Sequence, residues 1–69
     1  MLVAMTEYTQ TFERPYITAG KFYRVVSTSG SLYNIIDDTG QEIIIPKGRP
    51  AAHLEDKGSF KFFDLIELP

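Results

Sequence analysis

The stretch LYNIIDDTGQEIIIP, Leu32 to Pro46, carries two short apolar runs separated by a turn. Both runs are rich in β-branched and aromatic residues, a composition typical of strands. Between them, Asp37–Gly40 supplies carboxylates that accept hydrogen bonds from backbone amides and a glycine that adopts positive φ. The sequence therefore predicts a β-hairpin with strands over 32–37 and 41–46. The second strand should end at Pro46, which has no amide proton to donate.

Segments of the same kind lie on both sides of this hairpin. A strand is predicted over 21–28 (KFYRVVST), followed by a turn at Ser29–Ser31, and another over 60–67. Residues 47–58 carry no clear period and predict a long loop, in which Ala51–Leu54 suit a single 3₁₀ or α-helical turn. Residues 1–19 are ambiguous, because three of their side chains have helical spacing while their threonines and aromatics favour a strand; we favour the strand.

Length and composition limit the class of protein. The chain has 69 residues, no cysteine and a formal net charge of −2. It is long enough for one core only, and it lacks thiols for disulfides or metal binding. We find no apolar run of membrane-spanning length and no signal peptide at the start, so we expect a cytoplasmic protein with no membrane partner.

Several of the expected strands are apolar on both faces. Strand alternation predicts one inward set that forms the core: Tyr23, Val25, Tyr33, Ile35, Ile43 and Ile45. It predicts an opposite set that includes Phe22, Val26, Leu32, Ile36 and Ile44, and in the last strand Phe60 and Phe62 lie opposite Phe63 and Leu65. Either barrel curvature and the N-terminal segment cover this second face, or it stays exposed and binds a protein, including a second copy of the chain.

The polar residues form no catalytic or metal-binding motif. Asp37, Asp38 and Glu42 are too few for a calcium loop, and a hairpin turn explains the two aspartates. His53, with Glu55 and Asp56 nearby, resembles an acid–base group, but no nucleophile or second histidine accompanies it. We therefore predict a protein that is not an enzyme, with no metal and no cofactor.

Basic residues offer an alternative to protein binding. Aromatic side chains among them would act as stacking platforms for single-stranded nucleic acid or RNA. The basic residues concerned are Lys21, Arg24, Lys47, Arg49, Lys57 and Lys61. Against this reading, acidic residues outnumber basic residues nine to seven.

The segments GKFYRV, Gly20–Val25, and YNIIDDTG, Tyr33–Gly40, resemble those of small SH3-like barrel proteins of bacteriophages and prophages. The resemblance covers about Gly20 to Pro46, and the last predicted strand fits as a closing strand. It implies an all-β, partly open, five-stranded SH3-like barrel over 20–69, preceded by an N-terminal extension over 1–19. It also implies a phage or mobile-element origin, action in the host cytoplasm and binding to a host protein or a defence component.

The hypothesis from the sequence is a small non-enzymatic accessory protein that binds a protein partner through an aromatic and aliphatic sheet face. The alternatives are a module that binds single-stranded nucleic acid or RNA, and a homo-oligomer. Aromatic side chains are enriched in interface hot spots, which favours Phe22, Tyr33 and Phe62 over the isoleucines. The predicted binding residues are Phe22, Arg24, Tyr33, Arg49, His53 and Phe62.

Overall fold

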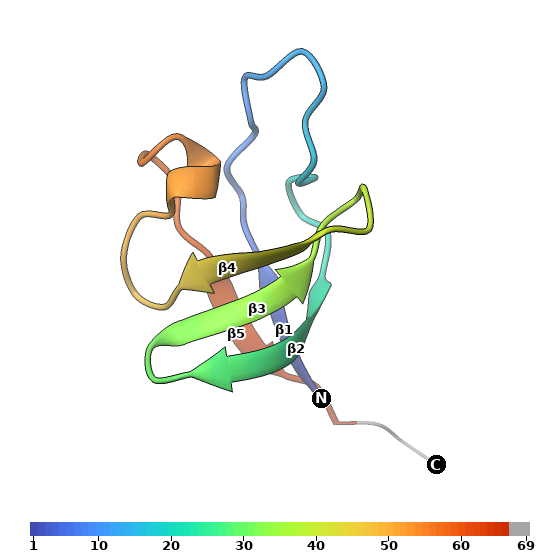
Figure 1. Cartoon of the computed structure of the whole chain (residues 1–69), viewed down its shortest axis with the longest axis vertical. Coiled ribbons are helices and arrows are strands. Elements are labelled where there is room, and N and C mark those ends of the chain that lie inside the picture. The colour runs from blue at the N-terminus through green and yellow to red at the C-terminus, as the bar shows by residue number, and fades with distance from the viewer. Residues whose placement is uncertain (67–69) are drawn as a thin grey trace.

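Five antiparallel strands form the sheet in the computed structural model, which describes residues 1–66. The elements are β1 (Leu2–Met5), β2 (Tyr23–Ser29), β3 (Leu32–Ile36), β4 (Glu42–Pro46), the 3₁₀ turn η1 (Ala52–Leu54) and β5 (Lys61–Asp64). The strand order is β4-β3-β2-β1-β5 (Figure 1). The predicted all-β class is confirmed.

The strands are slightly shorter than predicted, except that β2 continues to Ser29, which was expected in the turn, and local hydrogen bonds explain several of their limits. Lys21 lies before β2 because its amide bonds to Thr18 and its ammonium to Asp38. Asp37 belongs to the turn after β3, where its amide donates to Gln41. The predicted last strand over 60–67 reduces to Lys61–Asp64, and its end at residue 67 lies outside the described residues.

The sheet is strongly curved. β2 pairs with β1 on one side and with β3 on the other, so it belongs to two three-stranded halves, β2-β1-β5 and β4-β3-β2. A register shift between Val25 and Ser27 leaves Val26 as an extra residue, and bulges of this kind increase local twist and bending. Tyr33 on β3 and Phe62 on β5 have ring centroids 4.5 Å apart although two strands lie between them. The two halves therefore curl around one interior, as in a partly open barrel.

The N-terminal segment enters the sheet instead of covering it. β1 lies between β2 and β5 and pairs with both. The chain then forms a long loop over residues 6–22, which Figure 1 shows at the end of the molecule opposite the N-terminus. Thr6 and Gln10 hold this loop: the Thr6 hydroxyl donates to the Ser59 carbonyl, and the Gln10 carboxamide bonds to backbone of residues 16, 17 and 53.

The core fills the concave side of the sheet. Four of the six predicted core residues are buried: Tyr23, Ile35, Ile43 and Ile45. The other two, Val25 and Tyr33, are half-buried and pack against them. Side chains from outside the central strands complete the core: Ala4, Ile17, Ala51, Leu54 and Phe60. The 3₁₀ turn expected at residues 51–54 is present, and its role is to bring Leu54 into the core.

The hairpin turn is held by one carboxylate. Oδ1 of Asp37 accepts hydrogen bonds from the Thr39 amide, the Thr39 hydroxyl and the Gln41 amide, at 2.6–3.0 Å. Gly40 has φ +88°, a value that side chains with a Cβ atom rarely adopt. The expected use of carboxylate and glycine in this turn is therefore confirmed.

Candidate functional site

The structure distributes the six predicted binding residues over three regions. Phe22 and Arg24 lie on the convex, outer face of the β2-β1-β5 half, where both are exposed. Tyr33 and Phe62 lie on the concave side, half-buried against the core. Arg49 and His53 belong to the segment between β4 and β5 and lie on neither sheet face.

A continuous set of apolar side chains covers the outer face of β2-β1-β5. Val3 pairs with Arg24 on one side and with Phe63 on the other, and strand alternation carries the same face to residues 1, 5 and 65. The Phe22 and Phe63 rings meet edge to face with centroids 5.9 Å apart. We call this surface the outer apolar patch; it consists of Met1, Val3, Met5, Phe22, Phe63 and Leu65.

The patch is exposed at its rim and closed at its centre. Phe22 is 53% exposed and Phe63 is 39% exposed, whereas Val3, on the central strand β1, is buried. Two cationic side chains interrupt it, Arg24 and Lys61. Lys61 lies 3.5 Å from the Glu7 carboxylate, and Arg24 forms none of the ion pairs found among residues 1–66.

Of the six residues in this patch, only Phe22 was among the predicted binding residues. Alternation had already placed Phe63 opposite Phe62, so the signal for Phe63 was present, but Phe62 was chosen as the binding residue. The sequence gives no signal that Met1, Val3 and Met5 belong to the patch, because no local pattern indicates which strands the four-residue β1 pairs with. The outer face stays exposed because the N-terminal segment is used as a strand.

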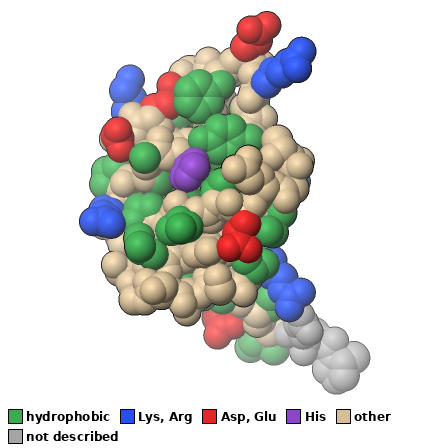
Figure 2. All heavy atoms as spheres, in the orientation of Figure 1, with side chains coloured by type: hydrophobic (Ala, Val, Ile, Leu, Met, Phe, Trp, Pro, Cys, Tyr) green, Lys and Arg blue, Asp and Glu red, His purple; other side chains and the backbone are tan. Residues whose placement is uncertain are grey.

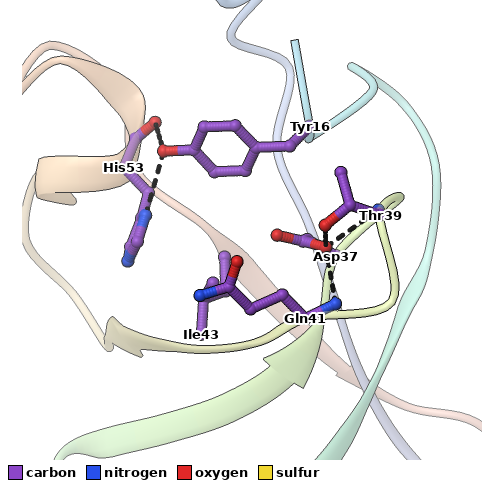
Figure 3. Close-up of a pocket in the computed structure, with 6 residues that line it drawn as sticks. All are labelled: Tyr16, Asp37, Thr39, Gln41, Ile43 and His53. Carbon is purple, nitrogen blue, oxygen red and sulfur yellow. Dashed lines mark hydrogen bonds between the residues drawn. The ribbon is translucent and has the colours of Figure 1, made fainter.

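A second feature is a small pocket at the end of the hairpin. It has a volume of about 170 Å³ and is lined by Tyr16, Asp37, Thr39, Gln41, Ile43 and His53 (Figure 3). The loop over residues 6–22 supplies Tyr16, and η1 supplies His53. The hairpin supplies the other four residues: Asp37, Thr39, Gln41 and Ile43. Hydrophobic side chains gather around the histidine on this face of the molecule (Figure 2).

Hydrogen bonds fix the aromatic wall of the pocket. The Tyr16 hydroxyl lies 3.0 Å from Nδ1 of His53, and the two rings meet edge to face at 5.7 Å. The Gln10 carboxamide oxygen accepts from the Tyr16 amide, while its nitrogen donates to the His53 carbonyl at 2.7 Å. Phe12 stacks on the Tyr16 ring at a centroid distance of 6.0 Å. The side-chain contact of His53 therefore joins η1 to the loop over residues 6–22.

Asp37 gives the pocket a negative charge. Burial raises the pKa of this carboxyl, but hydrogen bonds from Thr39 and Gln41 outweigh burial, and the resulting pKa lies below its usual value. All of these hydrogen bonds end on Oδ1. Figure 3 shows the other carboxylate oxygen pointing toward the space between Tyr16 and Gln41.

The neighbouring Asp38 is engaged elsewhere. It accepts hydrogen bonds from the Thr18 hydroxyl, the Lys21 ammonium and the buried Tyr23 hydroxyl at 2.6–2.9 Å. The Lys21 hydrogen bond is the main reason that the pKa of Asp38 lies below its usual value. Within residues 1–66, no three carboxylate or histidine side chains are grouped to hold a metal ion.

Comparisons of the chain with protein families, with curated proteins and with solved structures find no match. In the part of the chain that the structure describes, no helix has the length and apolar composition needed to cross a membrane.

Proposed function

We propose that this chain is a small accessory protein that acts by binding another protein through the outer apolar patch, without catalysis. The observation that carries the proposal is the exposed Phe22–Phe63 pair on the outer face of β2-β1-β5. Exposed apolar surface is costly in water, and contiguous patches of it commonly mark interaction sites.

The composition of the patch supports a protein partner. Aromatic and arginine side chains are enriched in interface hot spots. The patch combines two phenylalanines with Arg24, which pairs with Val3 of the neighbouring strand. The buried Val3 gives this surface a rigid base, since it lies in the central strand of the β2-β1-β5 half. The positive side chains Arg24 and Lys61 favour a partner whose apolar surface is bordered by acidic residues.

The origin of the chain is part of the proposal. The resemblance of Gly20–Val25 and Tyr33–Gly40 to small SH3-like barrels of bacteriophages and prophages supports a phage-encoded protein in the host cytoplasm. A host protein or a component of a defence system is then the natural class of partner. Nucleic acid is the competing class of ligand. It is distinguished from a protein partner by the dependence of its binding affinity on salt concentration.

The test is capture from a bacterial lysate by the immobilised chain, comparing the parent with Phe22→Ser and Phe63→Ser. We expect a retained protein that both variants lose, while their thermal unfolding stays cooperative. Ile44→Ser is the matched control, because Ile44 is also 53% exposed but lies on the outer face of β4, beyond the patch. This variant should retain the same protein as the parent.

Three outcomes would contradict the proposal. The first is retention of the protein by both serine variants. The second is capture of nucleic acid with an affinity that falls by about 10³-fold or more between 50 and 200 mM salt, as expected for several phosphate contacts. The third is a chain that self-associates through the patch, detected by sedimentation of the purified parent and of Phe63→Ser.

A further inference from the structure

The pocket between the hairpin and η1 lies apart from the outer apolar patch. The role inferred for it is additional to the proposed function. We propose that it binds a guanidinium group, either of an arginine side chain in a peptide or of a free small molecule. The inference rests on the size of the pocket, its carboxylate and its aromatic wall.

The volume suits a side-chain-sized group. Drug-sized ligands occupy pockets of roughly 300–1,000 Å³. The pocket has a volume of about 170 Å³, which is below this range. A guanidinium with one or two methylenes is much smaller than a drug-sized ligand and suits a pocket of this size.

The charge suits a cation. Asp37 is almost fully buried, and one of its carboxylate oxygens accepts three hydrogen bonds within the hairpin turn. The second oxygen faces the pocket and makes none of the hydrogen bonds found among residues 1–66 (Figure 3). The depressed pKa of this carboxyl keeps it ionised near neutrality. Lys21 forms its ion pair with Asp38 and does not neutralise Asp37. The Asp37 carboxylate can therefore attract a cation from outside the chain.

The remaining walls favour a planar cation over an ammonium. Tyr16 presents an aromatic ring, and its orientation is fixed by the hydroxyl contact to His53. Guanidinium groups stack on aromatic rings and donate several hydrogen bonds in one plane. The Asp37 carboxylate and the Gln41 carboxamide point into the same space and supply acceptors for these donors (Figure 3). Ile43 adds an apolar side that suits the methylenes next to the guanidinium.

The test is a titration of the ¹⁵N-labelled chain with ethylguanidinium, followed by amide chemical shifts. We expect saturable shifts confined to residues around Tyr16, Asp37–Gln41 and His53. Ethylurea, which is neutral and nearly isosteric, should cause no saturable shift at equal concentration. Butylammonium should bind at least several-fold more weakly. Equal binding of the ammonium, or saturable binding of the urea, would overturn the proposal.

Two variants locate the binding energy. Asp37→Asn keeps an oxygen to accept the turn's hydrogen bonds but removes the charge, and we expect affinity to fall by about tenfold or more, as for loss of a charge-assisted hydrogen bond. Asp64→Asn is the matched control, since its exposed carboxylate lies on β5 and the same charge is removed. Tyr16→Leu tests the ring without relying on the turn and should also weaken binding. Unchanged affinity in both Asp37→Asn and Tyr16→Leu would contradict the assignment.

The source of the guanidinium is decided by comparing ligands. A short peptide with one internal arginine should bind more tightly than ethylguanidinium if the natural ligand is a protein segment. The same peptide with citrulline in place of arginine should not bind. If ethylguanidinium binds and the peptide does not, the pocket takes a small molecule. Failure of the outer apolar patch to bind protein would leave these titrations unaffected.

Discussion

At the scale of single residues, Asp38 links two segments that are separate in the sequence, residues 18–23 and the hairpin turn. Its carboxylate accepts hydrogen bonds from the hydroxyls of Thr18 and Tyr23 and from the Lys21 ammonium. Tyr23 is buried, so its hydroxyl needs a partner inside the protein. One aspartate thereby fixes the end of the N-terminal loop to the hairpin.

The first prediction concerns pH. The pKa of Asp38 is lowered in the folded chain, chiefly by Lys21, so its contribution to stability is present above the unfolded pKa of about 3.9 and is lost as pH falls through the folded value. We expect Asp38→Asn to lower the free energy of unfolding at pH 7 by about 1–3 kcal/mol. The difference from the parent should shrink by pH 3 in urea unfolding. A difference that is constant between pH 7 and pH 3 would contradict this account.

The second prediction concerns a close backbone approach. A Cβ atom at Gly58 would lie 2.5 Å from Cβ of Tyr8 and 2.6 Å from its Cγ. Gly58→Ala should therefore destabilise the fold by about 1–3 kcal/mol, the usual cost of overpacking. Gly30→Asn is the comparison, because Gly30 has φ +60° and open space around it, and asparagine tolerates that conformation. Denaturant midpoints for both variants decide the point; a neutral Gly58→Ala would show that Tyr8 is not packed there.

At the scale of elements, the hairpin was predictable and the position of β1 was not. The β3–β4 pair is specified locally by two apolar runs and by a turn whose aspartate and glycine have defined roles. β1 pairs with β2 and with β5, which comes from the other end of the chain, and no short-range pattern encodes such pairings. The same limitation applies to the sites: residues of one strand could be assigned to faces, whereas the Phe22–Phe63 contact and the Tyr16–His53 contact depend on the whole topology.

The third prediction tests the assignment of strand faces on β4. Ile45 is fully buried, and its neighbour Ile44 is 53% exposed on the opposite face. Ile45→Ala should cost about 2–5 kcal/mol, as expected for a buried isoleucine. Ile44→Ala should change stability by about 0.5 kcal/mol or less, as for most surface substitutions. Equal urea midpoints for the two variants would mean that the register of β4 is misassigned.

At the scale of the whole molecule, so short a chain forms its core with one side of the sheet and leaves the other side open. Small domains bury a limited fraction of their surface, and here residues 6–22 and 51–58 fill the concave side with Ile17, Ala51 and Leu54. Among the residues that the structure describes, Phe22 and Phe63 on the convex side of β2-β1-β5 stay exposed. The outer apolar patch is a consequence of this distribution, and protein binding is the function we infer for it.

The most direct test of that claim is photo-crosslinking with benzoylphenylalanine placed at position 63 and, separately, at position 12. Phe63 lies in the outer apolar patch and is 39% exposed, while Phe12 lies on the N-terminal loop and is 45% exposed, so the two positions differ mainly in location. With the protein captured from lysate, we expect a crosslinked adduct from position 63 and none with the same protein from position 12. An adduct from position 12 without one from position 63 would contradict the account.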